Sequence, residues 1–534
     1  MIKEYKGIIA DVFTSEFYKG VVFVENSVIK KIVRQEHNCD NYILPGLVDS
    51  HVHIESSMST PSAFAKEAVK HGTVAAVCDP HEIANVLGVE GINYMISNGN
   101  KTPFKFFFGA PSCVPATDFE TSGAILDSVE VDKLLQRNDI YFLSEMMNYP
   151  GVIYENPDVM NKLSSAKKYK KRIDGHAPSL SGENLKKYIE EGITSDHECS
   201  TINEAIEKIK LGVKIQIREG SAAKNFANLY TLITTHNESV MLCTDDSHPE
   251  ELLKWHINKF FVLGKKQGIS FFDILKVATL NPVLHYNLNV GLLREGDKAD
   301  FIIIDNPENF KIIYTVINGV EVFANNKTNF RISKSTPLNN FNARKIIQQE
   351  IQILEEKPYN YVIEVIDGEL ITKVKKVSVP QELNDFKSLN INKIVVLNRY
   401  VNSAPSVGLI YNFNITNGAI ASSVAHDSHN IVAVGSDDKL IVKAINKLID
   451  NKGGIVVCSG DTLIDMPLEI GGIMTESEMS ETAAKYLKMV EAVKELKCNL
   501  TSPFMTLSFM SLPVIPEIKI TDKGLFDVLN FKFI

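Results

Sequence analysis

The sequence has few of the features that mark secreted, membrane or nucleic-acid-binding proteins. Its seven cysteines are scattered without a CxxC pair, which is typical of reduced thiols rather than a disulfide framework. No run approaches the ~18 apolar residues of a membrane-spanning helix, and the start, MIKEYKGIIADVFTSE, lacks the apolar core of a signal peptide. Acidic residues outnumber basic ones by 65 to 56, and the net charge of −9 argues against a nucleic-acid partner. We therefore expect a cytoplasmic protein with no membrane or nucleic-acid partner.

The composition is that of a folded protein of several domains. The chain has 534 residues, of which 44% are hydrophobic and 23% charged. Residues 1–45 contain short runs of β-branched residues separated by turn residues, and residues 291–332 have the same pattern. We expect these two segments to pair into one small β domain. Residues 333–534, which begin with a polar linker, are expected to form a C-terminal α/β domain.

Between these segments, residues 46–290 alternate strand-length apolar runs with longer helix-like stretches. Strands that alternate with helices indicate parallel βαβ units, and eight such units close into a (β/α)8 TIM-type barrel of ~250 residues. An open doubly wound sheet is the alternative. The eight runs are Leu47–His53, Val74–Asp79, Phe104–Gly109, Tyr141–Glu145, Arg172–His176, Ile193–His197, Lys214–Arg218 and Met241–Asp245.

Most of these runs end in residue types that bind metals or transfer protons. A TIM-type barrel builds its active site at this C-terminal end of its strands, whereas an open sheet does not readily bring so many strand ends to one point. The pattern therefore favours the closed barrel. The residues concerned are His51, His53, His81, Glu82, Glu145, His176, His197, Asp245 and Asp246.

His51 and His53 are the strongest signal, because residues i and i+2 of a strand point the same way and two imidazoles can then bind one cation. With His176, His197 and two carboxylates, the set exceeds the three protein ligands of a typical catalytic zinc site. The count predicts two metal ions, with Glu145 able to bridge them. Mixed imidazole and carboxylate ligands suit Mn²⁺, Fe²⁺ or Zn²⁺. Water bridging two such ions ionises near neutral pH and becomes a nucleophile.

Asp245 is expected to be both a metal ligand and a catalytic base. A carboxylate beside the attacking water can accept its proton and deliver it to a leaving group. Asp246 ranks second, because neighbouring residues of a strand point to opposite faces.

Extended motifs around these residues resemble a known family. The stretch from Pro45 to His53, PGLVDSHVH, resembles the first-strand signature of the amidohydrolase superfamily, and further motifs resemble its adenine deaminases over nearly the whole chain. These motifs are IESSM (54–58), CDPHEIANV (78–86), SEMMNYPGV (144–152), GHAP (175–178), SDHE (195–198), REGSA (218–222), CTDD (243–246), SSVAHDSHNI (422–431), GGIM (471–474) and PFMTLSFMSLPVIPEIKITDKGLFDV (503–528).

The resemblance implies hydrolysis of adenine to hypoxanthine and ammonia in purine salvage, by a metal-activated bridging hydroxide that attacks C6. It implies two divalent ions, Mn²⁺ or Fe²⁺ first and Zn²⁺ next, with Glu145 in the bridging place that a carboxylated lysine takes in other relatives. It also implies a homodimer or larger homo-oligomer. In the family pattern His51, His53 and Asp245 hold one ion, and His176 and His197 hold the other.

Attack at C6 pushes charge onto N1 of adenine, so a group must donate a proton there. Glu82 is the first candidate for this donor, with His81 beside it, and Glu55 and Glu198 are rivals. The residues expected to contact the purine are His81, Arg218, Ser221 and Glu55, although Arg218 and Ser221 can equally order a loop.

One segment and two other functions remain open at this point. The segment from His426 to Asn430 is rich in ligand types and can cap the barrel mouth, bind another ion or form a hydrogen-bonded turn. The alternative enzyme is another metal-dependent cyclic amidohydrolase or a deacylase, which releases a carboxylate instead of ammonia. A non-catalytic metal-bound scaffold is disfavoured because the ligand set is complete.

Overall fold

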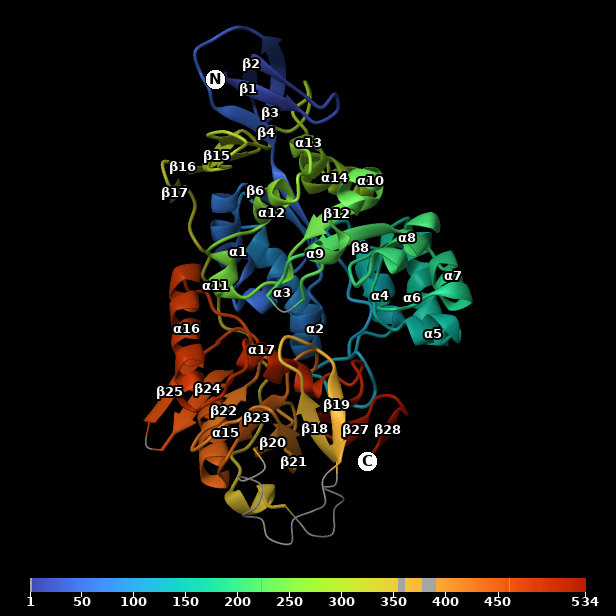
Figure 1. Ribbon diagram of the computed structural model, residues 1–534, viewed down its shortest axis with the longest axis vertical. Helices are drawn as coiled ribbons and strands as arrows, with labels where there is room; N and C mark the ends of the chain where they lie inside the picture. The colour runs from blue at the N-terminus through green and yellow to red at the C-terminus, as the bar shows by residue number, and fades with distance from the viewer. Residues whose placement is uncertain (1, 222, 354–360, 377–389, 461) are drawn as a thin grey trace. The chain divides into compact units, whose positions relative to one another are not determined.

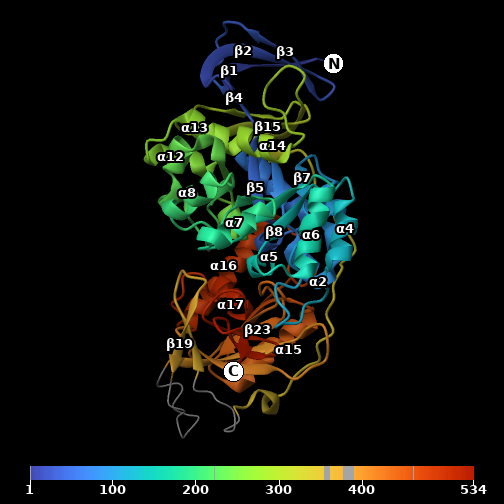
Figure 2. The same cartoon turned by 90° about the vertical axis from the view of Figure 1, so that its right-hand side faces the viewer.

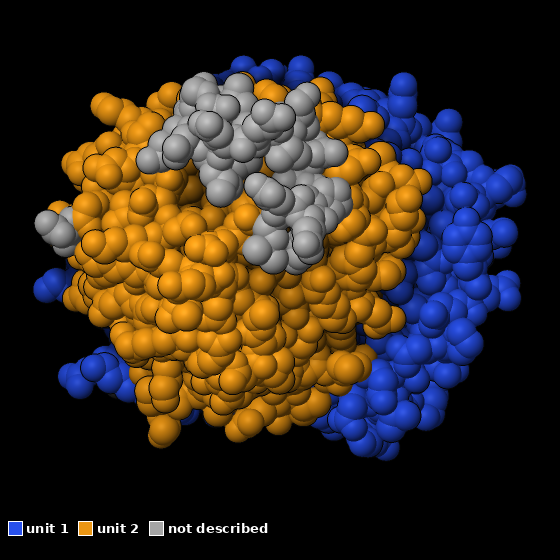
Figure 3. Space-filling model, turned by 90° about the horizontal axis from the view of Figure 1, so that it is seen from below, with its two compact units in different colours: residues 1–80, 94–112, 127–334 blue, residues 81–93, 113–126, 335–534 orange. Residues whose placement is uncertain are grey.

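The computed structural model describes residues 2–221, 223–353, 361–376, 390–460 and 462–534. The chain divides into two compact units that do not follow chain order (Figure 3). Unit 1 comprises residues 1–80, 94–112 and 127–334. Unit 2 comprises residues 81–93, 113–126 and 335–534, so two short segments from the N-terminal half belong to it.

Unit 1 contains one mixed sheet built from both flanks of the central region (Figure 1). Its strand order is β17-β16-β15-β14-β4-β1-β2-β3. β4 and β14 join the two flanks as an antiparallel pair, with Ile43 opposite Ile303. The core of the sheet includes Ile43, Phe301 and Val316, all buried. The strands are β1 (Lys3–Asp11), β2 (Glu16–Glu25), β3 (Val28–Arg34), β4 (Tyr42–Pro45), β14 (Phe301–Ile304), β15 (Ile312–Ile317), β16 (Val320–Ala324) and β17 (Lys327–Thr328).

The rest of unit 1 is a TIM-barrel-type α/β fold. Parallel pairing runs from β5 to β7 and from β8 to β12, and a bridge between Ala110 and Leu143 connects the two runs. β13 follows β12 directly and pairs with β5. All residues of β5 are buried, as expected for a parallel strand covered on both faces. The strands are β5 (Leu47–His53), β6 (Thr73–Cys78), β7 (Lys105–Phe108), β8 (Phe142–Met146), β9 (Arg172–Gly175), β10 (Ile193–Asp196), β11 (Lys214–Arg218), β12 (Val240–Cys243) and β13 (Asp245–Asp246).

Helices connect these strands, and their starts have clear sequence causes. Asn156 accepts hydrogen bonds from the backbone of Asp158 and Val159 at the start of α6, and Pro157 occupies its first turn. Asp127 caps α4 in the same way. The connecting helices include α1 (Pro61–Ala68), α3 (Val89–Gly99), α4 (Ser128–Leu135), α6 (Pro157–Lys168), α7 (Gly182–Glu190), α8 (Ile202–Lys210), α12 (Lys259–Lys266) and α14 (Asn281–Tyr286).

Unit 2 is built on a second sheet, with the order β19-β18-β21-β20-β23-β22-β24-β25. Helix α15 (Asp438–Asn451) packs Ile441 and Ile445 against strand residues such as Val395 and Ala433. Figure 2 shows this helix beside β23. The strands are β18 (Tyr361–Val365), β19 (Thr372–Lys376), β20 (Ile391–Leu397), β21 (Ser406–Tyr411), β22 (Ala419–Ser422), β23 (Ile431–Gly435), β24 (Gly454–Ser459) and β25 (Thr462–Pro467).

Further elements complete unit 2. They are α2 (His81–Leu87), α16 (Met479–Glu495), α17 (Pro503–Ser508), β26 (Ile518–Thr521), β27 (Gly524–Asp527) and β28 (Lys532–Phe533). Hydrogen bonds hold the two inserted segments to the C-terminal part of the chain: Asn430 Nδ2 donates to Thr121 O at 2.8 Å, and Asn340 Nδ2 to Val86 O at 3.3 Å. Among the helices that the model describes, none has the length and apolar character needed to cross a membrane.

Candidate metal centre

The centre begins with two histidines on β5. The Nε2 atoms of His51 and His53 lie 3.1 Å apart, so both imidazoles point to one place, as their i, i+2 spacing predicts. His53 Nδ1 lies 3.2 Å from the carbonyl oxygen of Asp79. A carbonyl only accepts hydrogen bonds, so Nδ1 carries the ring proton and Nε2 keeps a lone pair for a metal.

Asp245 lies beside this pair because β13 is the parallel neighbour of β5. Its Oδ1 is 3.2 Å from His53 Nε2 and 3.6 Å from His51 Nε2. The backbone of Asp245 has a φ of 57°, a left-handed conformation that aspartate tolerates better than most residues and that is often found at functional sites. Burial raises the pKa of the Asp245 carboxyl, but Arg218 and the imidazoles of His53 and His197 hold it well below its ordinary value.

Glu145 is the second-last residue of β8, and both of its carboxylate oxygens lie near imidazoles. Oε1 lies 3.4 Å from His53 Nε2, while Oε2 lies 2.9 Å from His176 Nδ1 and 3.1 Å from His197 Nε2. Burial raises the pKa of this carboxyl, but His176 and His197 hold it well below the ordinary range, so it is ionised. One carboxylate with an oxygen on each side is the arrangement that a bridging ligand requires.

His176 and His197 follow β9 and β10 by one residue, so their strands end slightly earlier than the apolar runs indicate. The ring of His197 stacks on that of His51, with centroids 4.1 Å apart. Burial lowers the pKa of His176, but the carboxylates of Glu198 and Glu145 raise it further, to about 9. The negative charge at this position therefore attracts a cation.

The donor set fits divalent metal ions. Three groups in unit 1 each place their ligand atoms within 4.8 Å of one another: His51, His53 and Asp245; His51, Glu145 and His197; and His176, His197 and Glu198. Spacings near 3 Å are those of ligands that bind one ion at ~2.1 Å and subtend about a right angle.

Arg218 and Glu198 form a contact that the sequence did not reveal. Arg218, at the end of β11, donates to both oxygens of Glu198, at 2.5 and 2.9 Å, and to Asp245 Oδ2 at 2.5 Å. This fork is bidentate on one carboxylate and joins it to the other. The charge of Arg218 lowers the pKa of Glu198 against the effect of burial, so this carboxyl is held ionised. Only the shared position of these residues at neighbouring strand ends hinted at the contact.

The other predicted residues have partners in loops and turns near the strand ends. Ser221 Oγ accepts from the backbone of His248 at 2.8 Å, so it orders the loop after β11. Asp246 Oδ1 accepts from Ser56 Oγ at 2.5 Å. Glu55 is buried in the 3₁₀ turn Ile54–Ser57, directly after β5.

His81 and Glu82 begin α2 and belong to unit 2. There Glu82 meets a segment more than 340 residues away in the chain: its carboxylate contacts His426 Nδ1 and His429 Nε2. Burial raises the pKa of Glu82, but His426, His429 and His81 hold it well below the ordinary value. The structure thus brings Glu82 together with the histidine-rich segment whose role the sequence left open.

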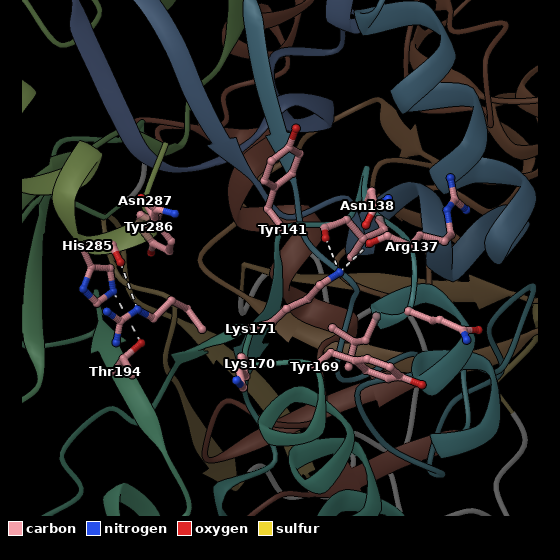
Figure 4. A pocket seen from close by; sticks show the side chains of 14 residues that line it. Arg137, Asn138, Tyr141, Tyr169, Lys170, Lys171, Thr194, His285, Tyr286 and Asn287 are labelled. Carbon is pink, nitrogen blue, oxygen red and sulfur yellow. Dashed lines mark hydrogen bonds between the residues drawn. The ribbon is translucent and has the colours of Figure 1, made fainter. Parts of the chain in front are cut away.

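A pocket of about 650 Å³ lies at the other end of the strands in unit 1 (Figure 4). Its lining comes from the loops before β8 and β9 and from the end of α14, and it contains none of the proposed metal ligands. Lys171 Nζ donates to the carbonyls of Arg137 and Ile140, as the dashed lines in Figure 4 show. Its cation is therefore occupied by the backbone, and this pocket is not the candidate active site.

Comparison with known proteins defines first the class and then the family. Residues 42–322 match the model of the amidohydrolase family, and residues 369–532 match that of the adenine deaminase C-terminal domain. Adenine deaminase of Methanosarcina barkeri (strain Fusaro) is 51% identical over 100% of this chain and 99% of its own length, and that of Sulfurovum sp. (strain NBC37-1) is 48% identical over 99% of each. The chain therefore belongs to the adenine deaminase family within the amidohydrolases.

The solved structures that the chain resembles are more distant in sequence than these relatives. β-Aspartyl dipeptidase from Fervidobacterium islandicum AW-1 is 16% identical, with a TM-score of 0.47, over 62% of this chain and 100% of that one.

Proposed function

We propose that this chain hydrolyses adenine to hypoxanthine and ammonia. The observation that carries the proposal is a connected set of four imidazoles and two carboxylates, Glu145 and Asp245, in a chain about half identical to adenine deaminases over its full length. The glutamate supports the proposal, because its two carboxylate oxygens lie near imidazoles that come from different strands.

Two divalent ions, Mn²⁺ or Fe²⁺ first and Zn²⁺ next, are the proposed cofactors. His51, His53 and Asp245 would hold one ion, His176 and His197 the other, and Glu145 both. When bound, such ions lower the pKa of water to near neutrality. The set contains only nitrogen and oxygen donors, which suits all three metals, so metal reconstitution decides among them.

Asp245 is the proposed proton carrier. Because the Arg218 guanidinium holds it ionised, Asp245 can accept a proton from water as the oxygen attacks C6 of adenine. It then delivers that proton to the departing exocyclic nitrogen, which leaves as ammonia. Arg218 thereby keeps the base in its active form and fixes its orientation.

Glu82 remains the proposed donor of the proton that N1 requires. It lies on the first turn of α2, which follows the end of β6 after a short loop. We predict that Glu82→Gln lowers kcat for adenine by 10²-fold or more, about the contribution of one general acid, while the metal content stays that of the wild type. Steady-state ammonia release and metal analysis measure both. Near-normal turnover with metals retained would eliminate Glu82.

The function itself is tested by assaying ammonia and hypoxanthine after separate reconstitution with Mn²⁺, Fe²⁺ and Zn²⁺. Turnover at about two ions per chain is the expected result. Full metal occupancy without release from adenine would overturn the substrate assignment, and cyclic amides would then be assayed. We also propose a cytoplasmic homodimer or larger assembly, which light scattering coupled to size exclusion would test.

A further inference from the structure

Asp49 is a fully buried carboxylate on β5, two residues before His51. Its Oδ1 accepts hydrogen bonds from the backbone N–H groups of His51, at 3.3 Å, and of Thr244, at 3.1 Å. Its Oδ2 accepts from Thr244 Oγ1 at 2.5 Å. Thr244 directly precedes Asp245 in the chain. One carboxylate therefore ties the backbone beside a proposed ligand on β5 to the backbone beside a proposed ligand on β13.

His256 completes the surroundings of Asp49. Its Nε2 lies 3.0 Å from Asp49 Oδ2, and its Nδ1 lies 2.6 Å from Thr73 Oγ1 on β6. The imidazole is buried and meets the ring of Phe64 edge-on, with centroids 5.5 Å apart. Burying a carboxylate costs free energy unless polar groups replace the water around it. The partners of Asp49 replace that water, and they fix the place of its side chain between the two strands.

A second buried carboxylate has the same relation to the other proposed ligands. Asp196, the last residue of β10, directly precedes His197. Its Oδ2 accepts from the backbone N–H of Ala177, the residue after His176, at 3.0 Å. Its Oδ1 accepts from the backbone N–H of Glu198 at 2.8 Å. This carboxylate therefore ties the loop after β9, which carries His176, to the loop after β10, which carries His197.

A lysine completes the surroundings of Asp196. Lys208 of α8 is 1% exposed, and its Nζ lies 3.1 Å from Asp196 Oδ2. The same ammonium donates to the carbonyl of Ala177 at 2.8 Å and lies 3.2 Å from Glu204 Oε1. Both members of this buried ion pair therefore bind the backbone of Ala177, next to a proposed ligand.

The partners of the two carboxylates lie in different parts of unit 1. We propose that each carboxylate is the positioning residue of one metal ion. Asp49 sets the spacing of the ligands on β5 and β13, and Asp196 sets the spacing of the ligands after β9 and β10. The affinity for one ion can then change without the other. This inference rests on the proposed two-ion centre and deepens it.

The spacing of ligand atoms decides how tightly an ion is held, because a metal–ligand distance tolerates deviations of only about 0.2 Å. His51 Nε2 lies 3.6 Å from Asp245 Oδ1, and His176 Nδ1 lies 3.3 Å from His197 Nε2. In each pair, the backbone beside both members is bound to one carboxylate. A small shift of that carboxylate would therefore move both members of its own pair.

Two nearly isosteric variants test the proposal. Asp49→Asn and Asp196→Asn each replace a carboxylate oxygen by an NH₂ group, which cannot accept the hydrogen bonds made there. Each variant should weaken the binding of one ion by about 10- to 100-fold and leave the other ion unchanged. Asp49→Asn should empty the position beside His51, and Asp196→Asn the position beside His176. The exposed Asp40→Asn is the matched control.

The main readout is metal retention by the full-length, Mn²⁺-loaded protein. A chelator lowers the free Mn²⁺ concentration stepwise, and the ions per chain are counted at each step. Anomalous diffraction from Mn²⁺-loaded crystals shows which position has lost its ion. Thermal unfolding and adenine turnover are measured in parallel.

Two milder variants apply the same test with both carboxylates intact. Thr244→Val removes only the hydroxyl donor to Asp49, and Lys208→Gln removes the ammonium beside Asp196. Each should weaken the same ion as the corresponding Asn variant, by a smaller factor. They decide the question if an Asn variant does not fold.

The expected result is loss of a different ion from each Asn variant. Wild-type retention in both variants would overturn the inference, and so would equal loss at the two positions, because the carboxylates would then support the centre as a whole. A wild-type chain with fewer than two ions would overturn the two-ion centre and the inference with it. Selective loss in a protein that does not deaminate adenine would support the inference and overturn only the substrate assignment.

Discussion

The side chain of Lys519, on β26 of unit 2, is fully buried. Its Nζ donates to the carbonyl of Leu370 at 2.9 Å, and burial lowers its pKa to about 7 from 10.5. Between these two values the unfolded chain binds the proton that the folded chain releases. The free energy of unfolding therefore rises with pH across this window, and the cost of burying Lys519 is largest at pH 7 and below.

We predict that Lys519→Met stabilises unit 2 at neutral pH. Removing the buried cation should raise the free energy of unfolding by roughly 3–4 kcal/mol near pH 7, after allowing for the lost hydrogen bond. Urea unfolding at pH 6.5 to 9.5 measures the difference, which should shrink as pH rises. The exposed Lys452→Met provides the control. A difference between variant and wild type that stayed constant with pH would contradict the buried charge as its cause.

At the residue scale, the sequence could predict which side chains gather at the strand ends, but not all of their partners. The common direction of His51 and His53 follows from strand spacing, because a period of two fixes direction locally. The approach of Asp245 and Glu145 to His53 follows from the position of all three near the carboxyl ends of parallel strands. The Arg218–Glu198 fork and the Glu82–His429 contact depend on which side chains meet across the fold. No local periodicity encodes such contacts.

At the element scale, the parallel strands could be predicted from the sequence, because strands buried on both faces are nearly continuous apolar runs. Their ends were less accurate: His176 and His197 lie one residue beyond β9 and β10, because a strand ends where ladder pairing stops and not where a polar residue appears. For helix α2, the sequence did not indicate the compact unit to which the helix belongs. Its sequence follows a barrel strand, yet it belongs to unit 2, since its partners lie far along the chain.

Gly109 tests the join between β7 and β8. A Cβ there would lie 2.2 Å from Ser144 Oγ and 2.8 Å from the Phe142 ring, and Ser144 directly precedes Glu145. We predict that Gly109→Ala destabilises unit 1 by about 1–3 kcal/mol, as overpacking does, and lowers metal content by shifting Glu145. Urea unfolding and metal analysis measure these effects.

The matched control is Gly296→Ala, a site with open space around it and a φ of 88°. Its cost should be limited to backbone strain of about 1 kcal/mol, and it should leave metal content unchanged. Equal metal content in Gly109→Ala and wild type would show that β8 adjusts without moving Glu145.

At the whole-molecule scale, the chain is not a simple series of domains. The domain boundaries expected from the sequence, 46–290 and 333–534, were placed where the residue pattern changes along the chain. The compact units instead assign residues 81–93 and 113–126 to unit 2. A residue pattern is local, whereas membership of a core depends on contacts between distant parts of the chain. The sequence could therefore indicate where strand patterns change, but not that two segments after parallel strands belong to unit 2.

A cut after residue 334 therefore leaves two segments without their partners. Within unit 2, Thr121 N donates to Asp522 Oδ1 at 2.9 Å, Thr521 Oγ1 donates to Phe119 O at 2.9 Å, and Asn430 donates to Thr121 O. We predict that residues 1–334 alone aggregate or unfold at a lower temperature than the full chain, because Ile83 and Val86, buried in the full chain, would lose the unit that surrounds them. Thermal unfolding and limited proteolysis measure the stability of the truncated chain. The control is the full-length chain with a protease site inserted at residue 334 and left uncut, because that chain still contains residues 335–534. A truncated chain that unfolds at the wild-type temperature would show that residues 81–93 and 113–126 fold without residues 335–534. Normal deamination of adenine by that chain would favour a hydrogen-bonded turn as the role of the segment from His426 to Asn430.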